Sequence, residues 1–288
     1  MSRGMRTLSA TVLLLAITAL PASGQSWRTM AKARQLRGQE RLEVNIEYAV
    51  GRLEVSKGPT AFLYRFESKY DEEVFELQSN YLESESRGVL RIDIAGENDI
   101  DIKRMRDYDD EAGVLKLALS PMIPVELNVE MGAAEAHLDL GGLRLSGLTL
   151  QTGASDTEIR FSQRNPEVAD SCIFKAGAAS VEIRQLGNSN CRRISVSGGV
   201  GAIDLDFSGD WNHDASADIN VGLGGIDLRV PAELGVRIEK NTFLMAFDAP
   251  GFEKQARGVY LSRNWDTADR KLTINISGAL GGITVARS

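Results

Sequence analysis

The chain has 288 residues, a formal net charge of −7 and 43% hydrophobic residues, an ordinary composition for a folded protein. Its negative charge argues against nucleic acid as a partner, because neutralising phosphate groups requires clustered Lys and Arg. The 28 glycines and 7 prolines suit a β-sheet protein with many tight corners. The length allows one elongated domain or two compact ones.

Residues 1–24 have the features of a secretory signal peptide: Arg3 and Arg6, an apolar run over 11–20, and small residues at 22–24. We therefore expect an exported protein, in the periplasm or outside the cell. The apolar run is shorter than the roughly 20 residues that span a bilayer, and no other segment is apolar enough, so we expect no membrane span after cleavage. No cysteine follows the run, so we expect no lipid anchor there.

Residues 25–40 are polar and are predicted to be a leader or a helical turn. From residue 41 the pattern is β, because Leu42, Val44 and Ile46 alternate with polar residues. Less regularly connected strands over 41–124 indicate an N-terminal β subdomain that contains the first coils. Residues 125–288 are predicted to be the repeat domain.

The repeat domain contains a recurring unit of strand, glycine corner and strand. The corner glycines follow each other at intervals of 21 to 24 residues and are Gly132, Gly153, Gly177, Gly199 and Gly222. Further copies cover residues 42–55 and 272–285. A strand repeat with a period of about 22 residues predicts an all-β fold, a single elongated β-solenoid. We expect the corner glycines to adopt positive φ.

Stacking of the copies predicts a continuous core. The fourth, sixth and eighth residues after each corner are apolar in nearly every copy, and only Gln185 breaks the series, which places it near a coil edge. Residues 231–271 interrupt the repeats and are predicted to be an excursion or an edge strand. The closing copy at 272–285 is expected to be a capped end of the solenoid.

Cys172 and Cys191 are the only cysteines and lie about one repeat apart. An isolated pair in an oxidising compartment is usually a disulfide, which here would join adjacent coils and contribute on the order of 3 kcal/mol. A redox-active pair is the alternative, but the spacing is far from Cys-x-x-Cys.

Charged residues recur at outward positions of the repeats. The fifth residues after four successive corners are acidic (Glu158, Glu182, Asp204 and Asp227), and the residues two positions later are Arg160, Arg184, Asp206 and Arg229. Like charges on adjacent strands destabilise a sheet, so pairing with the arginines between coils is one interpretation. The alternatives are a cationic partner or a divalent cation. These carboxylates, with Arg160, Arg184 and Arg229, are the candidate binding surface.

Catalytic and metal-binding patterns are weak. His137 and His213 are the only histidines, no Gly-x-Ser-x-Gly elbow occurs, and zinc lacks sufficient Cys and His ligands. The acidic stretch 99–111 does not match the EF-hand spacing, and we interpret it as a solvated loop, with weak calcium binding as the alternative. No catalytic residue, metal or cofactor is assigned.

The pattern at residues 219–230, 274–285 and above all 271–285 resembles the toast-rack β-solenoid domains of bacterial cell-envelope proteins. These include LiaF-like cell-wall-stress response proteins and related adhesin-type domains. The resemblance implies a solenoid with no established catalytic residues. A signal peptide replaces the transmembrane region of LiaF itself, so regulation of a membrane kinase is not transferred.

These observations favour an exported, non-catalytic envelope protein that presents a repetitive surface for binding or scaffolding. Its partner would be an envelope protein or a glycan that the sequence does not identify. One alternative is a carbohydrate-active enzyme that uses two neighbouring outward carboxylates. The other is a structural protein that self-associates through open solenoid ends. The sequence does not determine the oligomeric state.

Overall fold

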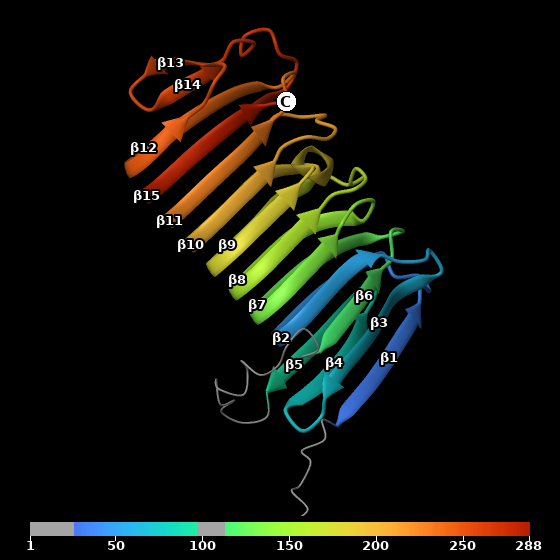
Figure 1. The fold of residues 1–288 in the computed structure, drawn as a ribbon. Coiled ribbons are helices and arrows are strands. Elements are labelled where there is room, and N and C mark those ends of the chain that lie inside the picture. The colour runs from blue at the N-terminus through green and yellow to red at the C-terminus, as the bar shows by residue number, and fades with distance from the viewer. Residues whose placement is uncertain (1–25, 97–112) are drawn as a thin grey trace, which may run out of the picture.

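The computed structural model describes residues 26–96 and 113–288, in which fifteen strands form one sheet. The all-β solenoid predicted from the repeats is confirmed (Figure 1). The predicted signal peptide at residues 1–24 and the acidic stretch 99–111 lie outside the described residues. No helix within the described ranges is long and apolar enough to cross a membrane.

The strands are β1 (Trp27–Gln35), β2 (Arg41–Lys57), β3 (Phe62–Asp71), β4 (Phe75–Ser84), β5 (Arg87–Gly96), β6 (Val114–Leu119), β7 (Pro124–Asp139), β8 (Arg144–Arg160), β9 (Ala169–Arg184), β10 (Cys191–Asp206), β11 (Ala215–Val230), β12 (Gly235–Asp248), β13 (Phe252–Ala256), β14 (Val259–Ser262) and β15 (Lys271–Arg287). A short 3-10 turn, η1 (Leu186–Ser189), connects β9 to β10.

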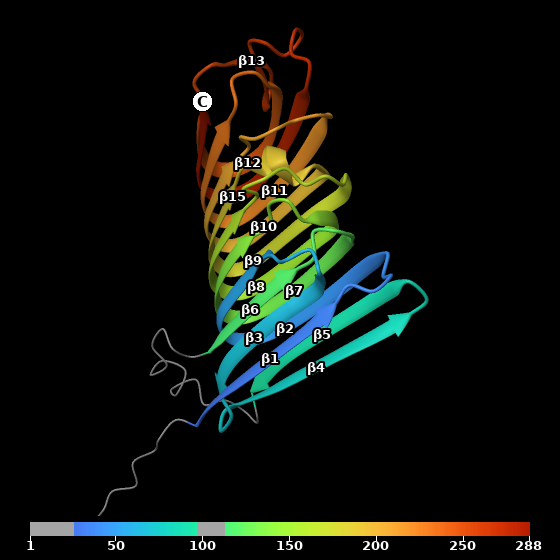
Figure 2. The ribbon, with the colours of Figure 1, turned by 90° about the vertical axis from the view of Figure 1, so that its right-hand side faces the viewer.

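The long strands are the structural unit, and we call each of them a rung. A rung bends at its corner into a first arm and a second arm, and neighbouring rungs pair in parallel and in register. In β8 and β9, for example, Leu148 lies opposite Cys172 on the first arm and Ile159 opposite Ile183 on the second. Figures 1 and 2 show the rungs stacked side by side along an elongated, twisted body.

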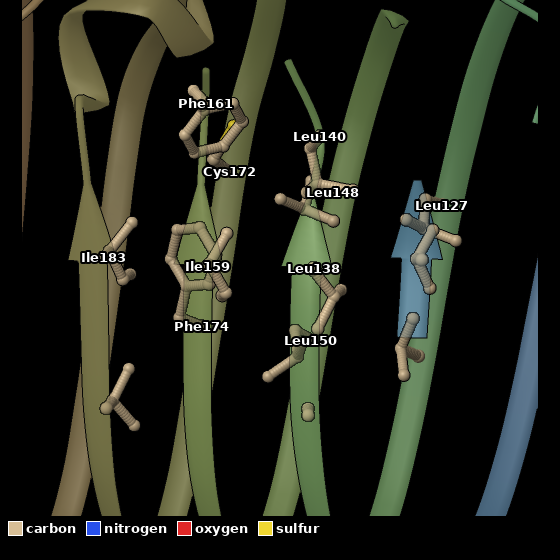
Figure 3. Packing of buried hydrophobic residues seen from close by; sticks show 14 of the residues in the cluster. Leu127, Leu138, Leu140, Leu148, Leu150, Ile159, Phe161, Cys172, Phe174 and Ile183 are labelled. Atoms are coloured by element: carbon tan, nitrogen blue, oxygen red, sulfur yellow. The ribbon is translucent and has the colours of Figure 1, made fainter. Parts of the chain in front are cut away.

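The predicted core columns are confirmed. Side chains alternate along each arm, and the inward-facing ones from both arms pack into one cluster (Figure 3). Phe161, Phe174 and Phe207 are its largest fully buried members. Gln185 lies where β9 ends and the chain turns with a φ of 59°, and Leu186 is buried instead.

The corner glycines are required for a reason other than the one expected. The positive φ values occur two residues later, at Gly201 and Gly224, and not at the corner residues themselves. A Cβ on corner residue Gly222 would lie 2.5 Å from the carbonyl oxygen of Gly199 in the preceding rung. Close stacking of rungs, rather than backbone conformation, therefore leaves no room for a side chain at Gly222, whereas β2 and β15 have Ala49 and Ala279 at the equivalent corners.

The N-terminal end of the stack is irregular. β5 pairs with the first arm of β2 and β6 with its second arm, so these two strands together replace one rung. β4 and β3 pair antiparallel with β5 and β6, and β1 pairs antiparallel with β3. Residues 25–40 were expected to be a leader or helical turn, but 27–35 form β1, because pairing with β3 outweighs their polar composition.

The C-terminal end differs from the expected capped end. β15 does not close the stack but lies between β11 and β12, in the order β11-β15-β12-β14-β13. The interrupting segment 231–271 therefore contributes the edge rung β12 and the hairpin β13–β14. The closing repeat is an interior rung, because both of its sides are paired.

Candidate binding surface

The strand register aligns the four outward carboxylates on the second arms. Glu158 lies opposite Glu182, Glu182 opposite Asp204, and Asp204 opposite Asp227. Paired strands are about 4.8 Å apart, so the four residues form a column on one face, which we call the acid column. His137 extends it by one rung, because it lies opposite Glu158.

The arginines do not neutralise the acid column evenly. Arg184 bridges two of its members, with Nε 2.6 Å from Oε1 of Glu182 and Nη1 3.3 Å from Oε1 of Glu158. Arg160 instead pairs with Asp139 at 2.9 Å. Within the acid column, carboxylates of adjacent rungs are therefore bridged by one arginine, Arg184, at the β8–β9 end.

The other end of the column has a carboxylate excess. Within residues 26–96 and 113–288, neither Asp204 nor Asp227 forms an ion pair, and Arg229 lies 4.0 Å from Asp206. Partial burial raises the pKa of Asp204, Arg229 opposes the rise, and the charges of Glu182 and Asp227 add to it. A cationic group placed here would relieve this repulsion.

Sequence reasoning missed an ionic chain that leads into the column. Arg52 Nε lies 2.8 Å from Glu135 Oε2, and His137 contacts Glu135 at 2.8 Å and Glu158 at 3.6 Å. Hydrogen bonds from Arg52 and His137 lower the pKa of Glu135. Alignment of the repeats contained this information, because it places Arg52 opposite Glu135 and His137 opposite Glu158.

Asp139 is the best-bonded carboxylate on this face. Its Oδ1 accepts hydrogen bonds from the hydroxyl of Ser162 at 2.7 Å and the backbone N–H of Gly141 at 3.1 Å, and its Oδ2 accepts from Arg160. Burial alone would raise the pKa of Asp139, but these hydrogen bonds together lower it. Asp139 therefore ties neighbouring coils together rather than offering a free charge.

A shallow groove of about 770 Å³ crosses the rungs at their corners. The corner glycines leave room for it, and a row of polar residues borders it (Gln151, Lys175, Ser197, Asn220 and Ser277). The groove and the acid column are separate features, since none of the acid column residues lines the groove.

The predicted disulfide is present. Cys172 on β9 and Cys191 on β10 are bonded, with Cα atoms 6.1 Å apart, and both side chains are buried. The bond links adjacent rungs and closes the loop that contains η1. Because disulfides persist mainly in oxidising compartments, it agrees with a location outside the cytoplasm.

The histidines lie apart. His137 is in the ionic chain, whereas His213 contacts Asn190 Oδ1 at 3.0 Å in the loop before β11. In the described part of the chain, no three His, Cys, Asp or Glu side chains converge as metal ligands. The divalent-cation interpretation of the acid column therefore gains no geometric support.

Comparison with known proteins identifies the family. Residues 23–184 match the model of the N-terminal domain of toast_rack. A suggested cell adhesion protein from Clostridium sporogenes is structurally similar, with 18% sequence identity, a TM-score of 0.50, and coverage of 91% of this chain and 100% of that one. A suggested adhesin from Parabacteroides merdae has 9% identity and a TM-score of 0.37, with 91% and 96% coverage.

The comparison with curated proteins finds no match. The structural likeness to the Clostridium sporogenes protein shows the fold, and the family match covers more than half of the chain. The chain therefore belongs to the toast-rack family.

Proposed function

We propose that this protein is an exported, non-catalytic component of the bacterial cell envelope. It binds a partner through the acid column and the arginines beside it. The partner is an envelope protein or glycan that carries cationic groups. The features of residues 1–24, the disulfide and the family support the location. Similar solved structures include proteins suggested to act in cell adhesion, which agrees with a binding role.

The observation that carries the proposal is the uneven neutralisation of the acid column. Glu158 and Glu182 share Arg184, whereas Asp204 and Asp227 form no ion pair within the described residues. The rungs hold these carboxylates at a fixed spacing, so a partner with regularly spaced cationic groups would meet them without ordering costs. Exposed ion pairs contribute less than about 1 kcal/mol each, so binding requires several contacts.

The test is a pull-down with the mature chain, from its own envelope fraction and with purified peptidoglycan and polysaccharide. We expect retention of a specific partner, a several-fold loss with Asp204→Asn/Asp227→Asn, and a larger loss when Glu158→Gln and Glu182→Gln are added. The matched control is Asp170→Asn/Asp210→Asn, which removes the same charge elsewhere and should leave retention unchanged.

Equal loss with the acid-column pair and with the control pair would overturn this assignment, because net charge rather than a surface would then determine binding. Complete loss after any single carboxylate change would contradict a multi-contact surface.

A further inference from the structure

The corners of the last rungs carry a continuous row of exposed apolar side chains, which we call the corner ridge. One position after each corner, Val200 lies opposite Leu223, Leu223 opposite Leu280, and Leu280 opposite Leu244. These four side chains are 44% to 60% exposed, and Phe243, at the corner of β12, is 82% exposed. Their rungs β10, β11, β15 and β12 are neighbours at one end of the stack (Figure 1). A contiguous exposed apolar patch of this kind indicates an interaction surface.

The corner ridge is confined to that end of the stack. On the earlier rungs β7, β8 and β9 the same position holds Ala133, Ala154 and Ala178, so stacking does not require a large side chain there. On β10, β11 and β15 no charged residue lies within three positions of the corner. The corners of β2, β7 and β8 have acidic residues within that distance (Glu47, Glu130, Glu135 and Asp156).

The charged residues nearest the corner ridge are cations. Lys175 lies at an outward position two residues before the corner of β9. The backbone N–H of Lys240 donates to the carbonyl of Gly258, so the β13–β14 turn, with the exposed Arg257, lies level with the corners. Residues 231–288 carry eight Lys or Arg and six Asp or Glu, although the whole chain has a net charge of −7. This end is therefore cationic on an otherwise acidic protein.

The acidic residues of these rungs lie farther from the ridge. The nearest are four or five positions from a corner (Glu182, Asp204, Asp218, Asp227, Glu239 and Asp248). A strand rises about 3.3 Å per residue, so their distance from the corner is about 13 to 17 Å. This exceeds the Debye length of about 8 Å at physiological ionic strength. An anionic surface at the ridge is therefore attracted by the nearby cations and largely screened from these carboxylates.

The shape of the ridge fits a bilayer surface. The core fills the inside of the bend, so the corner is its convex side, and none of the four apolar side chains in register lines the adjacent groove. A convex apolar edge can enter the headgroup region of a bilayer. The corners of β10, β11 and β15 lie between paired rungs on both sides, so their ladder bonds are already made when lipid covers them.

A second copy of the chain fits this surface less well. Two identical ridges in contact would bring Lys175 and Arg257 of both copies to the same interface. No acidic residue within three positions of the corners of β9, β10, β11, β15 or β12 would offset their repulsion.

We propose that this end of the protein binds the surface of an anionic lipid bilayer. The corner ridge enters the headgroup region, and Lys175 and Arg257 lie against lipid phosphates. Binding of this kind draws on buried apolar area together with attraction of basic residues to anionic lipid. The contact uses residues outside the acid column, so it stands independently of the proposed function.

The first test is co-sedimentation of the purified mature chain with lipid vesicles. We expect binding to vesicles of phosphatidylcholine with phosphatidylglycerol, and weaker binding to phosphatidylcholine alone. Leu223→Ser/Leu280→Ser should weaken binding by about a factor of ten or more, because lipid then covers less apolar surface. The matched control is Leu82→Ser/Met122→Ser, whose side chains are 53% and 48% exposed elsewhere and whose replacement should leave binding unchanged.

Absence of binding to the anionic vesicles would overturn the proposal, and so would equal loss with the two pairs of substitutions. A protein that covers the ridge in place of lipid would give the first of these results. Circular dichroism of each variant shows whether it is folded.

The second test addresses the cations. Lys175→Gln/Arg257→Gln should weaken binding to the anionic vesicles severalfold, reduce its dependence on salt, and leave binding to phosphatidylcholine unchanged. The control is Arg164→Gln/Arg192→Gln, which removes the same charge from the ends of the arms that lie away from the corners. Equal weakening by both pairs would show attraction by net charge alone and would overturn the assigned orientation.

The third test measures insertion and keeps most of the ridge intact. Cys172 and Cys191 are bonded to each other, so Leu280→Cys supplies a thiol for an environment-sensitive dye. Emission of this dye should shift to the blue when anionic vesicles are added, whereas the same dye on Leu82→Cys should not respond. An unshifted emission at position 280 would contradict insertion. Twice the mass of one chain by light scattering without lipid would show that a second copy covers the ridge, which would also overturn the proposal.

Discussion

At the corner of the interior rung β11 stands Gly222, whereas Phe243 stands at the corner of the edge rung β12. Both rungs bend, so bending itself does not require glycine. Gly222 has the carbonyl of Gly199 directly beside it, and no room for a side chain remains. Ala279 stands at the equivalent corner of β15, which is paired on both sides, so stacking restricts the corner closely at Gly222 but does not require glycine in every rung.

The largest difference in unfolding free energy between the interior of the stack and its end should appear when a phenylalanine is replaced by alanine. Phe207 is fully buried, and Phe207→Ala should cost about 4 kcal/mol of unfolding free energy through lost burial and a residual cavity. Phe243→Ala, at the exposed corner, should change it by less than about 0.5 kcal/mol. Urea denaturation measures both, and similar losses would contradict the distinction.

A smaller difference in unfolding free energy is expected between alanine substitutions at two adjacent glycines, Gly224 and Gly225. Gly224 has a φ of 146°, and a Cβ there would lie 1.7 Å from the carbonyl oxygen of Gly201. Gly224→Ala should therefore cost about 3 kcal/mol through strain and displacement of the neighbouring rung. A Cβ on Gly225 would meet nothing within 4 Å, so Gly225→Ala is the control and should be nearly neutral. Equal destabilisation would show that close stacking is not the cause.

The smallest effect concerns charge within the stack. The pKa of Asp204 is raised in the folded state, so its ionisation costs stability as the pH rises above the ordinary value of 3.8. Asp204→Asn should therefore stabilise the protein at pH 7 by less than about 1 kcal/mol. This gain should vanish as the pH falls below 3.8. Urea midpoints at both pH values measure it, with Asp210→Asn in an exposed loop as the control, and a gain that persists in acid would contradict the sign.

The repeat architecture could be predicted because its signals are local. Alternation with a period of two fixes which residues face inward, and the nearly constant spacing of glycines fixes which residues are neighbours. Glu182 and Asp204 were therefore assigned to one column correctly. That Arg160 pairs with Asp139 could not be predicted. The conformation of a long side chain depends on the hydrogen bonds that position its partner, and Ser162 and Gly141 donate those bonds to Asp139.

The two ends could not be predicted for a different reason. β15 resembles every other rung, so nothing in its own sequence indicates that it pairs with β12 as well as with β11. β1 carries Arg28, Lys32 and Arg34, and such a strand is stabilised by its pairing with β3 rather than by its own apolar pattern. The alternation of apolar and polar residues can be read from each strand alone. The order in which similar strands pair is set only in the assembled sheet.

The position of β15 has a consequence for how the chain is made. β12 is synthesised first, yet its only full-length neighbour is β15, which emerges later. Until Lys271–Arg287 pairs with β11, the neighbour beside which β12 lies in the finished sheet is missing, and β11 lacks its partner on that side. Completion of this end thus depends on a late, long-range pairing of the kind that folds slowly. A chain in which β15 has not yet paired exposes an aggregation-prone edge that the finished protein buries.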